Sequence, residues 1–137
     1  MVRVTAELRG ANAMKRALMR LGAEAPKELG AALYAEAEAT MARSKTIVPV
    51  ETGALRSSGH VRLPKLEGPK VTVQMGYGGA AAPYAAAVHE RLHVRHKSPT
   101  RAKYLEHPFR ESTLGLLGRI AGRIRMALVR FARRGTA

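Results

Sequence analysis

The sequence contains no cysteine, no aspartate and no tryptophan, and each absence excludes functions. Without cysteine there are no disulfides, thiol nucleophiles or thiolate metal sites, which suits a reducing cytoplasm. Without aspartate the chain lacks the residue that usually supplies calcium loops, Walker B positions and Asp-oriented triads. Aromatic residues make up only 4% of the chain, so packing must rely on aliphatic side chains and the six methionines.

Long apolar runs are also missing. None approaches the roughly 20 residues that span a bilayer, and the first four residues begin an alternating pattern rather than a signal peptide. We therefore expect a soluble, cytosolic protein with no membrane partner. The 137 residues fit one domain, and the 46% hydrophobic content can fill one modest core. Residues 1–137 are thus expected to form a single domain.

Positive charge is what the chain has in excess. It contains 24 Lys and Arg residues against 10 Glu, a formal net charge of +14, which favours attraction to nucleic acid or to acidic surfaces. No stacking aromatics interleave with the basic residues, and no helix-turn-helix or RRM signature is present, so charge alone does not separate a nucleic-acid-binding module from a solvated or subunit-facing surface. The candidate DNA- or subunit-contacting residues are Arg56, Arg91, Arg95, Lys97, Arg101, Arg119, Arg123 and Arg130.

Hydrophobic periodicity predicts helices and strands in the first half of the chain. Apolar residues alternate along residues 2–8, as in a strand with one buried face. A short helix with apolar residues at three- and four-residue spacing should end at Gly22, and a longer helix should run from Pro26 to Pro49. The expected core stripe of the longer helix, narrow and built from small side chains, is Leu29, Leu33, Ala37, Met41, Ser44 and Val48.

After this helix we expect a loop over residues 49–59, a hairpin around residues 67–69, and a short helix from Pro83 to about Arg91. A basic loop to about Arg101 should precede a long C-terminal helix over about 109–134.

The string His89-Glu90-Arg91-Leu92-His93 has the spacing of a zinc-protease helix, in which two imidazoles bind Zn²⁺ and the glutamate activates water. A catalytic site needs a third protein ligand, and His96, Glu106 and Glu111 are all candidates. None of them completes a known zincin pattern, because the glycine and the further histidine of the extended metzincin signature are missing. We therefore expect no catalytic, metal or cofactor site, and we keep a small zinc-dependent hydrolase as the less favoured alternative.

Three ordered segments resemble the tail-component family of long-tailed bacteriophages. Residues 48–58 (VPVETGALRSS) resemble the family's P-V-[DE]-T-G-x-L-[RK]-x-S loop after a long helix. Residues 76–90 resemble its glycine turn and Y-A-x-x-V-[HE]-E helix, and residues 102–108 (AKYLEHP) resemble its A-K-[FY]-L-x-x-P segment, in which a short strand leads into the C-terminal helix. The resemblance gives His89-Glu90 a place in a family helix and leaves His93 in a loop.

The resemblance implies an α+β fold, in which a small, mostly antiparallel β-sheet of about four strands packs with a long helix in the N-terminal half and with the long C-terminal helix. It also implies a structural virion protein without catalysis, acting in neck formation or tail completion at the head–tail junction. It implies a homo-oligomeric ring that binds the head connector and the tail tube or tail terminator proteins, with nonspecific contact to exiting DNA. The expected location is the neck or upper tail of the virion, after assembly in the host cytoplasm. A basic nucleic-acid-binding module remains the alternative.

Overall fold

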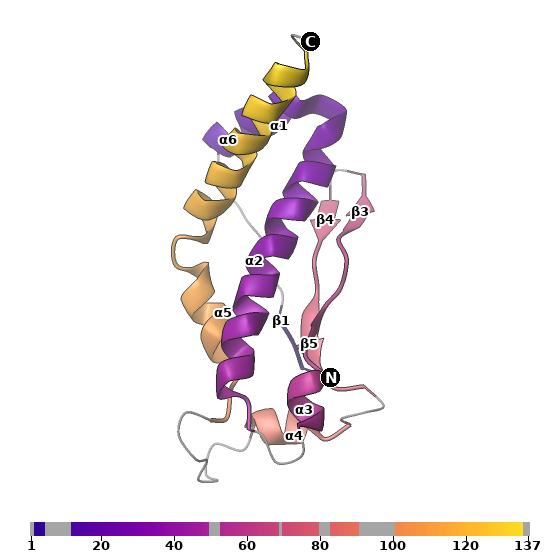
Figure 1. Cartoon of the computed structure of the whole chain (residues 1–137), viewed down its shortest axis with the longest axis vertical. Helices are drawn as coiled ribbons and strands as arrows, with labels where there is room; N and C mark the ends of the chain where they lie inside the picture. Colours follow the sequence, from indigo (N-terminus) through magenta and orange to yellow (C-terminus); the bar gives the residue numbers. More distant parts are fainter. Residues whose placement is uncertain are drawn as a thin grey trace.

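The computed structural model of the chain describes residues 2–4, 12–49, 53–68, 70–79, 83–90 and 101–135. Its central element is the helix α2 (Ala25–Ile47), with Pro26 in the first turn and Pro49 just beyond the end, as the sequence predicts. Helices α5 (Glu106–Thr113) and α6 (Leu116–Arg134) pack on one side of α2, and the strands lie on the other (Figure 1). No helix within these described ranges is both long and apolar enough to cross a membrane.

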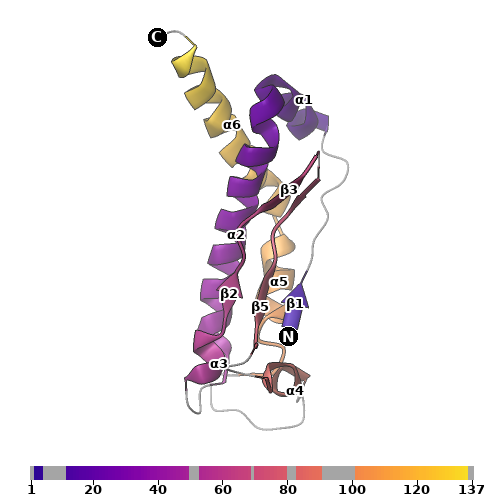
Figure 2. The ribbon, with the colours of Figure 1, turned by 90° about the vertical axis from the view of Figure 1, so that its right-hand side faces the viewer.

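Helix α1 (Asn12–Leu21) turns back onto α6 at one end of the molecule (Figure 2). The 3₁₀ turn η1 (Gly22–Glu24) joins it to α2, and Gly22 has the positive φ of 57° expected where the first helix stops. Two apolar clusters result. One joins α1, the first half of α2 and α6, and the other joins the second half of α2 to the sheet and the turn before α5.

All strand pairs among the described residues are antiparallel, and they form two small sheets rather than one. The three-stranded sheet has the order β1 (Val2–Val4), β5 (Met75–Tyr77), β2 (His60–Val61). The hairpin predicted around Gly68 is confirmed as β3 (Lys65–Glu67) and β4 (Lys70–Thr72). Of the predicted first strand, the part beyond residue 4 lies outside the described residues.

A register change explains why the hairpin divides between two sheets. Val61 pairs with Met75, and the amide of Arg62 donates to the carbonyl of Gln74, but Lys65 pairs with Thr72. The first arm therefore has one residue more than the second arm, which is a β-bulge. Pro64 lies in this bulge and packs against α2, where a Cβ on Gly30 would come within 3.0 Å of the Pro64 Cβ.

Helix α2 is buried on two faces, so the prediction of one narrow core stripe is wrong. Ala37, Met41 and Val48 of that stripe are buried, whereas Leu29 and Leu33 are only partly buried. The further buried positions are Gly30, Ala32, Glu36 and Thr40. The sequence pattern conceals this second face because its members are small or polar.

The long C-terminal helix is confirmed, but it begins at Leu116 rather than at about residue 109. Leu114 is extended and Gly115 adopts a left-handed φ of 71°, which ends α5 and starts α6 in a new direction. Arg119 holds this break, because its guanidinium donates to the carbonyls of Ser112 and Leu114. The apolar period continues through the break, which is why the pattern predicts one helix.

Two other segments differ from expectation. The predicted loop over residues 49–59 contains a short helix, α3 (Ala54–Ser57), which begins after Gly53 with a φ of 81°. The short strand that the family resemblance implies within residues 102–108 is absent, because residues 102–105 form a turn and Lys103 has a positive φ of 55°. The helix predicted from Pro83 is confirmed as α4 (Ala85–Glu90).

Two glycine-to-alanine variants test this packing. At Gly59 a Cβ would lie 2.7 Å from the Tyr77 ring and 2.9 Å from the Met41 sulfur, so Gly59→Ala should destabilise the fold by about 1–3 kcal/mol through overpacking. At Gly118, on α6, a Cβ meets nothing within 4 Å, so Gly118→Ala should stabilise the fold by up to about 1 kcal/mol. Urea unfolding measures both values, and equal effects of one sign would contradict the packing.

Candidate functional site

The imidazole of His89, on α4, is buried and its two nitrogens have different partners. The backbone N–H of Glu106 donates to His89 Nε2 at 3.4 Å, so Nε2 accepts. The proton is therefore on Nδ1, which donates to the Glu90 Oε1 at 2.8 Å. Only 4% of His89 is exposed, and each ring nitrogen already has a hydrogen-bond partner within the fold.

Lys103 completes the cluster from the turn that precedes α5. Its Nζ donates to Glu90 Oε2 at 2.6 Å and lies 3.1 Å from Glu106 Oε2. These hydrogen bonds raise the pKa of Lys103 and lower the pKa of Glu90 and of Glu106, because they stabilise the charged forms. The backbone N–H of Lys103 also donates to the carbonyl of His89 at 2.8 Å, which ties the turn to the end of α4.

Of the candidate third zinc ligands, the fold places Glu106 beside His89 and pairs Glu111 with another residue. Ligand atoms of His89, Glu90 and Glu106 lie within 4.8 Å of one another, so Glu106 is the third-ligand candidate that the fold places next to His89. Glu111 instead pairs with His107 at 3.2 Å. His93 and His96 lie outside the described residues.

The chemistry of the cluster fits a folding role better than a metal role. A divalent cation would need a free imidazole lone pair and two uncompensated carboxylates. Here His89 Nε2 accepts a backbone hydrogen bond, and the Lys103 ammonium supplies the positive charge between the two carboxylates. The two carboxylate oxygens of Glu90 accept hydrogen bonds from Lys103 and His89, so Glu90 is not placed as a general base beside a metal-bound water.

A buried group of hydroxyls and rings lies next to this cluster. Tyr104 contacts His89 edge to face with centroids 5.0 Å apart, and it contacts Tyr77 in the same way at 4.9 Å. The Tyr104 hydroxyl donates to the Ala85 carbonyl at 2.7 Å. Ser44, fully buried on α2, donates to the Tyr104 carbonyl at 2.6 Å and lies 2.8 Å from the Tyr77 hydroxyl, which therefore donates to it.

The basic residues predicted to contact DNA or subunits have several different environments. Arg119 and Arg123 bind the carboxylate of Glu36, with Nε–O distances of 2.9 and 3.3 Å, and Arg130 binds Glu28 at 3.4 Å. Arg56 and Arg101 are exposed. Arg91, Arg95 and Lys97 lie outside the described residues.

Sequence reasoning missed the residues that join these groups. Glu36 stands in an alanine-rich helix and reads as a solvated charge, yet only 10% of its side chain is exposed. The four-residue spacing of Arg119 and Arg123 indicated a shared face but not the carboxylate that this face meets. Lys103 and Tyr104 belong to a segment that resembles the family, but nothing in the sequence indicates which side chains they contact.

Comparisons with family models, with curated proteins and with solved structures find no significant match to this chain.

The two buried tyrosines, Tyr77 and Tyr104, should ionise only at a higher pH than free tyrosine does. Burial raises the pKa of Tyr77 to about 12 and raises the pKa of Tyr104 further, against about 10 for free tyrosine. Folding stability from these groups is therefore complete below pH ~10 and is lost as the pH rises through about 12. Tyrosinate absorbance should show two of the four tyrosines titrating only as the protein unfolds, and four tyrosines titrating together near pH ~10 in folded protein would contradict the structure.

Zinc analysis tests the structural interpretation of the His89 cluster. Protein purified without a His tag should contain well under one equivalent of zinc, and its melting temperature should not rise with added zinc, because Lys103 already compensates both carboxylates. Lys103→Met is the matched variant, since it removes only the ammonium and exposes any metal affinity of the remaining ligands. One equivalent of zinc in the unmodified protein would revive the hydrolase alternative.

Proposed function

We propose that this protein is a noncatalytic structural component of the head–tail junction of a long-tailed bacteriophage. The proposal starts from the resemblance of residues 48–58, 76–90 and 102–108 to the tail-component family. In this role the protein assembles into a ring, meets the head connector on one side and tail proteins on the other, and works through shape and association.

One observation carries the proposal beyond sequence resemblance. The three resembling segments are far apart in the chain, yet each contributes buried residues to the same apolar cluster. Those residues are Val48, Leu55, Tyr77, Ala85, Tyr104 and Leu105. Motif residues that pack together specify a fold, whereas motif residues of an enzyme converge on an accessible pocket. The resemblance is therefore a resemblance of architecture, which is what an assembly protein needs.

The polar members of these segments support the same interpretation. His89 and Glu90, which gave the sequence its enzyme-like string, bond to each other, to Lys103 and to the backbone of Glu106. Their hydrogen bonds connect α4 to the turn before α5, so they position elements. Two ionisable groups set for catalysis would instead present an unfilled proton acceptor to a substrate.

Charge and shape suit a position between larger components. The molecule is elongated, with α3 and α4 at one end and α1 and the end of α6 at the other (Figures 1 and 2). A net charge of +14 favours binding to acidic neighbours and opposes indiscriminate self-aggregation before assembly.

Labelled virions provide the test. A small tag on the C-terminus of the protein, marked with gold particles, should be seen by electron microscopy at the neck or upper tail of phage particles. The same tag on a capsid protein and on a tail-fibre protein of that phage serves as the control for accessibility. Label confined to the capsid or to the fibres, or absent from virions in which both controls are labelled, would overturn the proposal.

A further inference from the structure

The positive charge of the protein is concentrated on two neighbouring helices. Helix α1 contains three basic residues and α6 contains six, and neither contains an acidic residue. These two helices therefore contribute nine positive charges to a formal net charge of +14. By contrast, α2 contains three basic and three acidic residues, although it is the longest helix. We call α1 and α6 together the basic helix pair.

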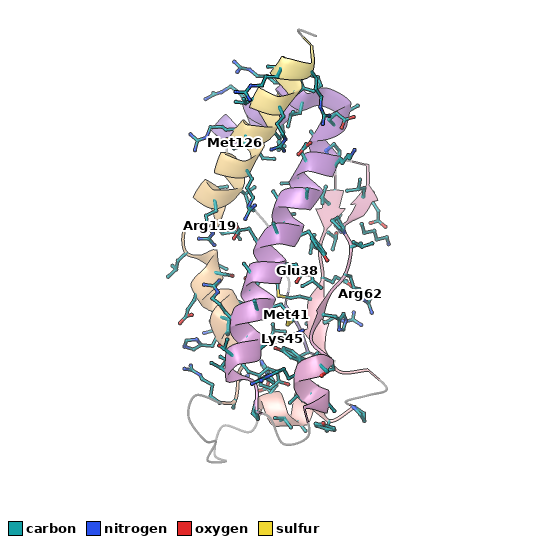
Figure 3. All side chains as sticks on the ribbon, viewed as in Figure 1. Glu38, Met41, Lys45, Arg62, Arg119 and Met126 are labelled. Carbon is teal, nitrogen blue, oxygen red and sulfur yellow. The ribbon has the colours of Figure 1, made fainter. Side chains whose placement is uncertain are left out.

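The two helices of the basic helix pair are in contact with each other. α1 packs against α6, and α1 and the C-terminal end of α6 both lie at the end of the molecule remote from α3 and α4 (Figures 1 and 2). Arg16, Arg20 and Arg125 are exposed there. Met126 points outward from the same part of α6 (Figure 3) and is 59% exposed.

Internal ion pairs neutralise only part of this charge. Glu36 accepts from both Arg119 and Arg123, so this group of three keeps one positive charge. Arg123 and Arg130 each give a single nitrogen to their carboxylates, at 3.3 and 3.4 Å, and their side chains are about half exposed. A guanidinium carries five N–H donors, so both retain donors that face solvent.

We infer that the basic helix pair binds the phosphate backbone of double-stranded DNA without reading its sequence. The 19 residues of α6 extend over about 28 Å, which matches roughly eight base pairs of duplex. Arginine is suited to phosphate because its planar fork can bind two oxygens. The pair contains one aromatic residue, Phe131, so it lacks the stacking platform that single-stranded DNA requires.

This surface is a property of the folded chain, because α1 and α6 are separated by most of the sequence. It does not depend on the head–tail role, and a DNA-binding surface and a place in the neck can fail separately. Loss of DNA binding leaves the labelling of virions unchanged, and failure of the labelling leaves the binding measurement intact.

The test compares two triple variants of equal charge. Arg16→Gln, Arg20→Gln and Arg125→Gln remove three exposed charges from the basic helix pair. Arg43→Gln, Arg62→Gln and Lys70→Gln remove three exposed charges from α2 and the strands. Fluorescence anisotropy with a labelled 20-base-pair duplex is recorded between about 50 and 200 mM salt. Circular dichroism and urea unfolding verify that both variants fold.

The unmodified protein should bind the duplex with a steep salt dependence. The helix-pair variant should lose affinity by about tenfold or more, and its log–log salt slope should fall by about 2–3, since each lost phosphate contact contributes about 0.9. The control variant should lose less than about threefold, because distant charges are screened. The single variant Arg125→Gln should lower the slope by about one.

Three outcomes would overturn the inference. The first is the absence of binding of the unmodified protein to the duplex at the lowest salt. The second is an equal loss of affinity in both triple variants, which would show that the attraction comes from net charge rather than from this surface. Displacement of the duplex by poly-glutamate at equal charge concentration would assign the surface to an acidic protein instead.

Discussion

The hydroxyl of Ser44 is the constraint on which the arrangement of α2, β5, α4 and the turn before α5 depends. It is fully buried on α2, accepts a hydrogen bond from the Tyr77 phenol and donates one to the Tyr104 carbonyl. Leaving a buried phenol without its partner costs roughly 1–3 kcal/mol, so this small residue fixes where α2 meets β5 and the turn before α5. Tyr104 is thereby held against the ring of His89, and the end of α4 follows. One small polar side chain on α2 thus fixes where α2, β5, α4 and the turn before α5 meet.

Electrostatics organises the other half of the molecule in a different way. The buried carboxylate of Glu36 receives Arg119 and Arg123 from α6, and Arg119 also binds the carbonyls at the end of α5. A buried carboxylate is tolerated only when it is paired and hydrogen-bonded, so these contacts fix the angle between α2 and α6. Among the eight glutamates that lie in the described ranges, six take part in ion pairs. Acidic residues in the described ranges therefore serve mainly to join elements.

The His89 cluster shows how a motif of enzyme-like residues can be a folding device. Its spacing suggests two metal-binding imidazoles on one helix, and the first of them, His89, lies buried on α4 with both ring nitrogens hydrogen-bonded. Glu90 and Glu106 both pair with Lys103, which lies between them. The backbone of Lys103 has a positive φ, a conformation that residues other than glycine rarely adopt. That conformation is stabilised by the bond from its N–H to the His89 carbonyl.

The sequence by itself determined what depends on local physics. Pro26 and Pro49 bracket α2, Gly68 lies at the hairpin turn, and Gly22 ends α1, because proline and glycine restrict the backbone wherever they occur. The long C-terminal helix followed from the apolar period, whereas the α+β class followed from the resemblance of three segments to a known family. The partners of polar residues could not be predicted in this way. Glu36 and Arg119 are 83 residues apart, and no periodic pattern encodes which arginine a buried carboxylate will meet.

Tertiary structure also decided the break at Gly115 and the two buried faces of α2. In each case the local signal was compatible with two outcomes: apolar period continues across Leu114, and alanine is neutral between core and surface. Packing resolved them, because α5 and α6 must each follow a different part of α2, and because small side chains let two layers approach one helix. The same holds for the His89 string. The sequence determines the spacing of these residues, but only the folded chain places Lys103 and Glu106, from the turn and helix that follow, next to Glu90 and His89.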